Sequence, residues 1–379
     1  MKWLRVVLLV ALFAKLPCNA AAEVGVSDHT ITIGMSSPFS GPNGAYGLAM
    51  KEVIGAYFQQ INAAGGIHGR KLELVALDDG YETERTVANT KKLIDEHRAF
   101  ALLAFYGSSP TTAAMNEVFG PAKVPLVGTI SGADTLRVPA NRYMFNVRAS
   151  YANETEAIVN QLVFIGVKSI AVLYQNDGFG RSGLEGVSAA LKKHGLVPAA
   201  VGTVERNSVD VSAAVQAIAK VNPQAVVMIT LYKPTAEFVR QMRKSGHNIQ
   251  FMTLSPVGAD LLVKELGDDA RGIGISQVVP YPWNDTTPVV RDYRKLLNQY
   301  AKHDQYSYYG VEGYMMARVL ADALKRSGRD LSRERLVSTL ESMQNHDLGG
   351  YQVSYSPTNH NGSKFVDLTV IGSGGQIMR

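Results

Sequence analysis

FALLAFYGSSPTT, residues 100–112, decides the fold class, because it joins a continuous apolar run to a turn rich in glycine and hydroxyl groups. An apolar run without polar alternation is typical of a parallel-sheet strand that helices cover on both faces. In open α/β sheets ligands bind outside the carboxyl ends of strands, so the turn is a candidate binding loop. Its hydroxyl residues Ser108, Ser109 and Thr111 either cap the next helix or, with that helix's N–H groups, hold an anionic carboxylate.

Strand and helix patterns alternate on both sides of this stretch. The apolar residues between Met50 and Ile61 recur every three or four positions, which predicts one buried helix face. Continuous apolar strands that alternate with helices indicate parallel sheets. Two such series indicate two α/β lobes. The strands expected in the first series are 30–36, 71–77, 100–105 and 124–127, with helices at 84–98 and 111–119; in the second they are 169–174, 199–204, 225–229 and 251–254, with helices at 151–166, 182–194, 211–218 and 235–245.

The last third of the chain breaks the simple alternation. Residues 287–301, 311–327 and 333–341 are expected to be helices, and residues 365–371 form a final strand. One helix-rich return followed by a closing strand suits a chain that passes between the two lobes more than once.

Composition excludes several classes of site. The 38 basic and 33 acidic residues are spread along the chain, so nothing resembles a nucleic-acid footprint. Cys18 is the only cysteine, and the eight histidines form neither H-x-H nor H-E-x-x-H, so we expect no metal site. There is no G-x-S-x-G nucleophile elbow, and we expect no catalytic residues.

Residues 1–22 predict export. Lys2 and Arg5 precede a short apolar run that only Lys15 interrupts, and small residues end at Ala22. This order is typical of a cleaved secretory signal peptide, and we expect cleavage after Ala22. Cys18 offers the alternative of a lipoprotein, but the sequence before it, Lys15-Leu16-Pro17, lacks the small residues that lipid attachment normally follows.

Residues 178–183, GFGRSG, match the G-x-G-x-x-G pattern of dinucleotide-binding turns, and Glu205 follows about 20 residues on. Asp177 places a carboxylate beside the position of a pyrophosphate, so we interpret the glycines as a turn that feeds a helix, with no cofactor. Residues 128–134 form a second candidate binding loop after a strand. Asp78 and Asp79 are interpreted as loop and cap residues, because adjacent side chains on an extended segment point in opposite directions. Two interpretations remain for the aromatic group Tyr306, Tyr308 and Tyr309: it belongs either to a lobe surface or to the wall of a cleft.

Together these stretches resemble the leucine/isoleucine/valine-binding protein family, the exported solute-binding proteins of ABC importers with the type I periplasmic-binding fold. The resemblance covers essentially the whole chain after residue 22, in family order. The matching stretches are 41–47 (GPNGAYG), 61–69 (INAAGGIHG), 71–79, 108–112, 176–183, 231–234 (LYKP) and 251–257.

The resemblance implies two doubly wound parallel-sheet lobes, joined by three crossovers near residues 148, 277 and 354, that close on a ligand. Both lobes are then discontinuous. The N-terminal lobe takes residues 23–148 and 278–354, and the C-terminal lobe takes residues 149–277 and 355–379.

The resemblance also implies the ligand-binding positions. Ser108 matches the serine that receives a ligand carboxylate, and Ile130 matches a position that contributes backbone contacts. The candidate set also takes in the hydroxyls beside these two positions. The residues that we expect to bind ligand are Tyr46, Ser108, Ser109, Ile130, Ser131, Phe179, Tyr232 and Ser255.

Two positions depart from the amino-acid binders of the family. Gly132 stands where those proteins usually have a threonine, and Ser255 stands where they usually have a glutamate that faces the ligand ammonium. A buried ammonium without a carboxylate partner is costly, so an aromatic or aliphatic carboxylate without an amino group becomes a plausible ligand. Asp134 and Asp177 are the alternatives for the missing carboxylate, and amides or urea derivatives are further ligand classes.

We therefore expect a monomeric periplasmic substrate-binding protein that delivers a small organic solute to an ABC permease and ATPase complex and catalyses no reaction. The alternative is an extracytoplasmic sensor of amides or organic acids that acts through a partner protein.

Overall fold

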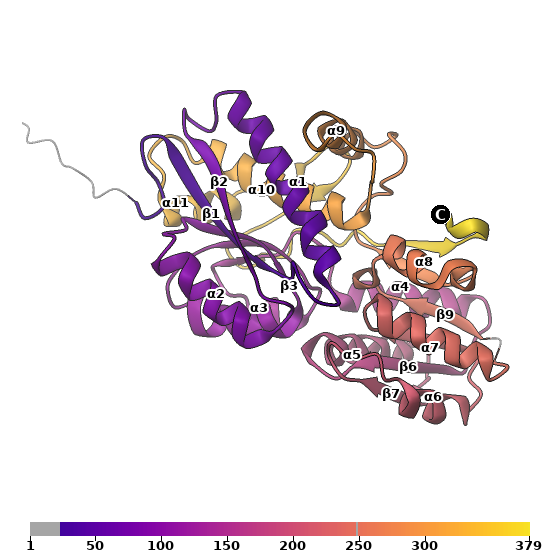
Figure 1. Ribbon diagram of the computed structural model, residues 1–379. Helices are drawn as coiled ribbons and strands as arrows, with labels where there is room; N and C mark the ends of the chain where they lie inside the picture. The colour runs from indigo at the N-terminus through magenta and orange to yellow at the C-terminus, as the bar shows by residue number, and fades with distance from the viewer. Residues whose placement is uncertain (1–22, 248) are drawn as a thin grey trace, which may run out of the picture.

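Two sheets, each flanked by helices, organise the chain (Figure 1). The computed structural model describes residues 23–247 and 249–379. The predicted signal peptide and the lipoprotein alternative at Cys18 therefore lie outside the described residues.

The first sheet has five parallel strands in the order β2-β1-β3-β4-β5. The apolar stripe of α1 is buried as predicted. Figure 1 shows α1 on one side of this sheet and α2 and α3 on the other. The elements are β1 Thr30–Ser37, α1 Gly44–Ala63, β2 Lys71–Asp78, α2 Thr83–Asp95, β3 Ala101–Tyr106, α3 Ser108–Ala114, the π-helical turn η1 Met115–Phe119, β4 Leu126–Ile130, the 3-10 turn η2 Asp134–Leu136 and β5 Met144–Phe145.

The second sheet has seven strands in the order β14-β13-β10-β9-β8-β6-β7. Its helix α4 begins at the side chain of Ser150, which accepts a hydrogen bond from the backbone N–H of Asn153. The elements are α4 Tyr151–Phe164, β6 Ile170–Gln175, α5 Gly178–Lys193, β7 Val201–Val204, α6 Ser212–Ala219, β8 Ala225–Ile229, α7 Tyr232–Lys244, β9 Gln250–Thr253, the 3-10 turn η3 Ser255–Val257, α8 Ala259–Leu266, the 3-10 turn η4 Gly267–Ala270 and β10 Gly274–Gln277.

After β10 the chain returns to the first sheet, where α10 packs against α1, β3 and β4. It then enters the second sheet as β13 and β14, so it passes between the sheets three times. The returning elements are α9 Pro288–Leu296, the π-helical turn η5 Leu297–Ala301, α10 Tyr308–Arg326, α11 Arg333–Glu341, β11 His346–Asp347, β12 Gln352–Val353, β13 Asp367–Ile371, the 3-10 turn η6 Ser373–Gly375 and β14 Ile377–Met378.

Three details differ from the sequence-based expectations. The strand expected at 124–127 is β4, residues 126–130, and Pro125 before it has no N–H to donate to a ladder. The helix expected at 111–119 begins at Ser108 and ends as a π-helical turn. The closing strand β13 is antiparallel to β10, because β10 ends where the chain leaves the second sheet and β13 starts from that same side.

Among the described residues, no helix combines the length and the apolar character that crossing a membrane requires.

Candidate functional site

The loops after β3 and β4 bring two serine hydroxyls together. Gly107 turns the chain from β3 into α3 with a φ of 90°, and a Cβ atom there would lie 2.4 Å from the ring of Tyr81. The turn places Oγ of Ser108 at 2.8 Å from Oγ of Ser131, the first residue after β4. Both serines are buried. The sequence predicted a candidate binding loop after each of these strands, and the structure shows the contact between the two loops.

A buried guanidinium lies behind the Ser131 loop. The Nη2 atom of Arg137 donates to the carbonyl oxygens of Ser131, Arg148 and Ala149, each at 3.2 Å. Burial lowers the pKa of Arg137 to about 10, with the nearby charge of Arg148 adding to the effect, so Arg137 stays positive at neutral pH. Within residues 23–247 and 249–379, no carboxylate forms an ion pair with Arg137. The hydrogen-bond partners of this positive charge are therefore neutral oxygen atoms, while the charges of Asp134 and Glu154 act on it at longer range.

Tyrosine rings from both lobes pack against one another at the end of β3, next to the turn that leads to Ser108. The ring of Tyr46, on α1, lies 5.5 Å from that of Tyr106, at the end of β3, and 4.5 Å from that of Tyr309, on α10. Tyr232, on α7 of the second lobe, meets Tyr46 edge to face at 5.6 Å. Burial raises the pKa of Tyr46 and of Tyr309 well above the usual value, so both hydroxyls are neutral hydrogen-bond donors. Tyr309, which the sequence left open, belongs to the interface between the lobes.

Hydrogen bonds join the lobes directly across this region. Tyr46 and Tyr309 donate from their hydroxyls to the carbonyl oxygens of Val257 and Pro256, at 2.7 and 2.8 Å. On the other side of the site, the N–H of Gly178 donates to Oγ of Ser109 at 2.9 Å. The structure is therefore a closed arrangement of the two lobes. Further contacts between the lobes are Tyr232 to Pro42, Gln175 to Tyr81, Asn43 to Asn207 and Arg206 to Glu82.

The glycine pattern at 178–183 serves backbone packing. A Cβ atom on Gly180 would lie 1.8 Å from the carbonyl oxygen of Gln175, and one on Gly183 would lie 2.6 Å from the side chain of Ile229. The carboxylate of Asp177 accepts hydrogen bonds from the N–H groups of Phe179 and Gly180, so it occupies the position of a bound phosphate. Asp177 is a helix cap, and burial raises its pKa.

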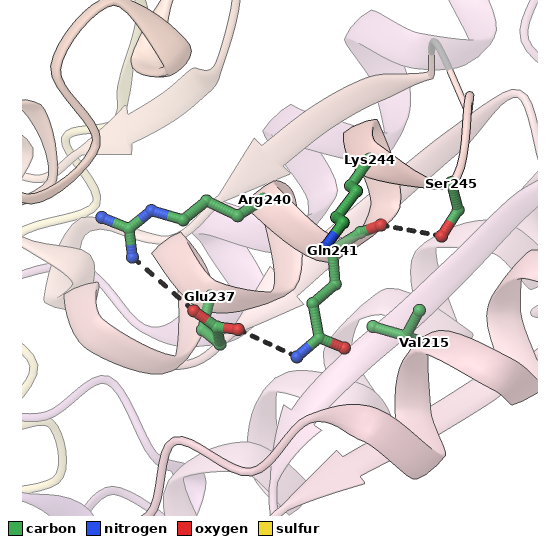
Figure 2. Close-up of a pocket in the computed structure, with 6 residues that line it drawn as sticks. All are labelled: Val215, Glu237, Arg240, Gln241, Lys244 and Ser245. Carbon is green, nitrogen blue, oxygen red and sulfur yellow. Dashed lines mark hydrogen bonds and ion pairs between the residues drawn. The ribbon is translucent and has the colours of Figure 1, made fainter.

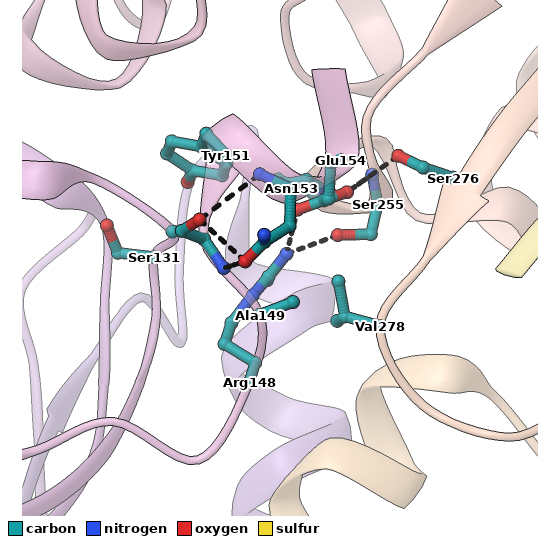
Figure 3. Close-up of polar contacts among 12 residues, drawn as sticks. Ser131, Arg148, Ala149, Tyr151, Asn153, Glu154, Ser255, Ser276 and Val278 are labelled. Atoms are coloured by element: carbon teal, nitrogen blue, oxygen red, sulfur yellow. Dashed lines mark hydrogen bonds and ion pairs between the residues drawn. The ribbon is translucent and has the colours of Figure 1, made fainter. Parts of the chain in front are cut away.

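Ser255 contacts charged residues instead of the tyrosines. Its Oγ accepts a hydrogen bond from Nη2 of Arg148, and its N–H donates to Oε2 of Glu154 at 2.9 Å (Figure 3). The Glu154 carboxylate also accepts from Oγ of Ser276 at 2.7 Å. A second carboxylate, that of Glu312, lies 3.4 Å from Nη1 of Arg148. Sequence reasoning missed both Arg148 and Glu312; the available signal was a lone charge inside apolar surroundings, as in Val311-Glu312-Gly313.

The other expected positions are also buried at this interface. Ile130 ends β4, and its carbonyl oxygen accepts from the N–H of Gly107 at 3.2 Å. Phe179 lies beneath Tyr151, with 5.2 Å between the ring centres. The expected ligand-binding residues did not include Tyr106 and Tyr151, although Tyr106 directly precedes the Gly107 turn. Of the eight expected residues, Tyr46, Ser109 and Tyr232 form hydrogen bonds between the lobes, and Ser255 lies on the η3 turn that accepts the Tyr46 hydroxyl.

Surface pockets elsewhere on the molecule are weaker candidates for a ligand site than the interface between the lobes. One lies beside α7, over Val215 of α6 (Figure 2), where Glu237 pairs with Arg240 at 3.7 Å and accepts from Gln241 at 2.9 Å. Its polar groups bind one another, which gives no reason to place a ligand there. In the part of the chain that the structure describes, no cluster of His, Cys, Asp and Glu residues suits a metal ion.

Comparisons with known proteins agree with this geometry. The model of a family described as periplasmic binding protein matches residues 30–376. The chain belongs to the periplasmic binding protein family. This periplasmic binding protein is 33% identical to a possible leucine/isoleucine/valine-binding protein from Rhodopirellula baltica, with a TM-score of 0.87 over 95% of this chain and 98% of that one.

The chain is also similar to two further binding proteins. A substrate-binding periplasmic protein from Ralstonia solanacearum is 33% identical, with a TM-score of 0.87 over 92% of this chain and 99% of that chain. An amino acid binding protein from Pseudomonas aeruginosa is 28% identical over 253 residues, which are 65% of this chain and 67% of its own. The family comprises solute-binding proteins rather than enzymes, and it places this binding protein in the periplasm.

Proposed function

We propose that this protein is the substrate-binding component of an ABC importer, which captures a small organic carboxylate between its lobes and delivers it to a permease and ATPase complex. Residues 1–22 direct its export, and it acts as a monomer. The lobes are residues 23–148 with 278–354 and residues 149–277 with 355–379. They hinge at the three crossovers near 148, 277 and 354. The closed state is stabilised when one ligand contacts both lobes.

The observation that carries the carboxylate is the buried charge of Arg137. Arg137 forms no ion pair with a carboxylate among the described residues, although the charges of Asp134 and Glu154 act on it at longer range, and an anion bound at the Ser108–Ser131 hydroxyl pair adds a counter-ion on that side. Hydrogen bonds to a charged group are also stronger than neutral ones. The ligand-binding residues in this proposal are Tyr46, Ser108, Ser109, Ile130, Ser131, Phe179, Tyr232 and Ser255.

The ligand class follows from Ser255. An α-amino acid brings an ammonium group, and the Pseudomonas relative is named for amino acids. Here Ser255 has no carboxylate of its own, and its hydroxyl and N–H are already bonded to Arg148 and Glu154, so it offers no partner to a ligand ammonium. An aromatic or aliphatic carboxylate without an amino group needs no such partner. Its apolar part packs against the rings of Tyr46, Phe179 and Tyr232.

Thermal unfolding of residues 23–379 against matched ligands tests the proposal. The pairs are leucine with 4-methylpentanoate and phenylalanine with 3-phenylpropanoate, after refolding to remove any carried ligand. A ligand at 100 times its Kd adds about 2.7 kcal/mol, which shifts Tm by several degrees. We expect shifts with the amino-free acids. Shifts with the amino acids alone would contradict the ligand class, and no shift with any carboxylate would contradict carboxylate binding altogether.

A further inference from the structure

Two carboxylates share one guanidinium where the lobes meet. Arg148 lies on the segment between β5 and α4, and its Nη2 atom lies 2.6 Å from Oε1 of Glu154. Its Nη1 atom lies 3.4 Å from Oε2 of Glu312, on α10 of the first lobe. All three side chains are at least 97% buried. We call these residues the Arg148 triad; with both carboxylates ionised, it holds one negative charge in excess, and the buried positive charge of Arg137 lies next to it, on the Glu154 and Arg148 side.

The two carboxylates are unequally supported. Glu154 accepts from Arg148, from the N–H of Ser255 at 2.9 Å and from Oγ of Ser276 at 2.7 Å (Figure 3). Glu312 has, among the described residues, only the 3.4 Å contact with Arg148. A buried carboxylate with one distant partner is costly in its ionised form, so Glu312 is the member of the triad that takes up a proton.

The surroundings of Glu312 agree with that assignment. Burial raises the pKa of Glu312 to about 7, while the charge of Arg148 opposes the rise and that of Glu154 adds to it. Burial also keeps the nearby hydroxyls of Tyr309 and Tyr351 neutral by raising their pKa values. The charges next along α10 and on α9 pair with each other, as Arg318 does with Asp292. The groups that α1 and β3 bring to Tyr309 are the neutral hydroxyls of Tyr46 and Tyr106.

Closure of the lobes and burial of the triad depend on the same short helix, η3. Ser255 of η3 contacts Arg148 and Glu154, while the next two residues accept the hydroxyls of Tyr309 and Tyr46. Glu312 lies one helical turn after Tyr309 on α10. Withdrawal of η3 from the first lobe therefore breaks the tyrosine contacts and admits water to Glu312 together.

We propose that Glu312 is a positioning residue that takes a proton from solvent when the lobes close and returns it when they open, so that closure weakens as the pH rises. The inference rests on the proposed function, because it takes the lobes to open and close. Glu312 acts through Arg148 and touches no ligand. In the open state water solvates its carboxylate; in the closed state the protonated form avoids a buried carboxylate whose one charged partner is 3.4 Å away.

A disulfide reporter measures closure without any ligand. A Cβ atom on Gly178 would lie 2.8 Å from Oγ of Ser109 across the lobes, which is within the reach of a disulfide. The reporter is the full chain with Ser109→Cys, Gly178→Cys and Cys18→Ser. The initial rate of disulfide formation with dipyridyl disulfide follows the closed population. The same reporter with Glu312→Gln is measured at each pH, and the ratio of the two rates cancels the chemistry of the thiols.

We expect the rate ratio, Glu312 over Glu312→Gln, to fall roughly tenfold or more between pH 5.5 and 8.5, because one pKa unit corresponds to a factor of ten. Glu312→Asp keeps a carboxyl group and should keep a pH-dependent ratio. Asp322→Asn is the control, since Asp322 lies on the same helix but pairs with His346 within the first lobe, and its ratio should stay flat.

A Glu312 ratio that is constant with pH overturns the inference, and so does the same slope in Asp322→Asn. Circular dichroism at each pH shows that the variants are folded. The reporter contains no ligand, so failure of the thermal panel contradicts the proposed function separately from this result.

Discussion

The hydroxyl of Tyr46 donates a 2.7 Å hydrogen bond to the carbonyl oxygen of Val257, although 211 residues separate them in the chain. The bond joins α1 of the first lobe to η3 of the second. The same hydroxyl accepts from the N–H of Tyr232 at 3.3 Å, so one buried oxygen links three elements. The contact therefore ties α1 of the first lobe to two elements of the second.

Tyr46→Phe should weaken ligand binding by about 1 kcal/mol, or roughly fivefold in Kd, because a net hydrogen bond contributes about that much and Val257 loses its donor. Calorimetry with the best ligand of the thermal panel measures the change. Tyr57→Phe is the control: Tyr57 is buried on the same helix but packs edge to face on Tyr314 within the first lobe. Equal effects of the two variants would contradict a role in closure.

Ser108→Ala should weaken carboxylate binding by roughly 1.5–3 kcal/mol, the range for a hydrogen bond to a charged group. Calorimetry with the same ligand gives the value. Thr112→Ala, on the next turn of α3, removes an exposed hydroxyl that bonds to Thr135 and should leave Kd unchanged. Unchanged affinity in Ser108→Ala would remove Ser108 from the proposed site.

Asp78 and Asp79 are adjacent in the chain, but they should make the free energy of unfolding depend on pH in opposite directions. Burial raises the pKa of Asp79 to about 6, against hydrogen bonds from Tyr81, Ser36 and Thr86 that lower it. In the folded protein the Asp79 carboxyl binds a proton more tightly than in the unfolded chain. Its contribution to the free energy of unfolding is therefore complete below pH 3.8 and is lost as the pH rises through 6. Urea unfolding from pH 3.8 to 7 should show this loss, and Asp79→Asn should abolish it.

The pKa of Asp78 is shifted in the opposite direction, so its effect on the pH dependence of stability is reversed. Its burial, which acts to raise the pKa, is outweighed by hydrogen bonds from Ser40, Phe39, Gly80 and Arg85, which together lower the pKa to about 2. Its stabilising contribution is therefore present above pH 3.8 and is lost as the pH falls toward 2. Asp78→Asn should flatten the acid limb only, and a change in the limb above pH 4 would show that the two signs are assigned wrongly.

Gly180→Ala should destabilise the fold severely, because its Cβ would lie 1.8 Å from a backbone oxygen, that of Gln175, which has no room to move. Gly55→Ala on α1 is the matched helical control. A Cβ there meets nothing within 4 Å, so that variant should gain about 0.5–1 kcal/mol from helix propensity. Urea unfolding compares the two. A mild effect of Gly180→Ala would show that the glycine pattern is not required for packing.

The strand ends and their loops were predictable from sequence, because they depend on local patterns. The apolar run 100–105 and the turn at Gly107 predicted a strand that ends in a binding loop, and β3 and α3 meet there. The glycines at 178–183 likewise predicted a turn that feeds a helix, and α5 begins there; that Asp177 caps this helix is a finding of the structure.

The contacts of Arg148 and Glu312 could not be predicted in this way. They lie 164 residues apart in the chain, and no periodicity relates them. The antiparallel direction of β13 depends on where the chain re-enters the second sheet, which local patterns do not encode.

The sequence alone thus determined the two α/β lobes, the loops at the strand ends and most of the aromatic residues between the lobes. The reason is that periodicity, turn chemistry and strand polarity act over a few residues. Only the tertiary structure decided which charges meet between the lobes. The cost of burying Arg148, Glu154 and Glu312 depends on partners that folding brings together from distant segments.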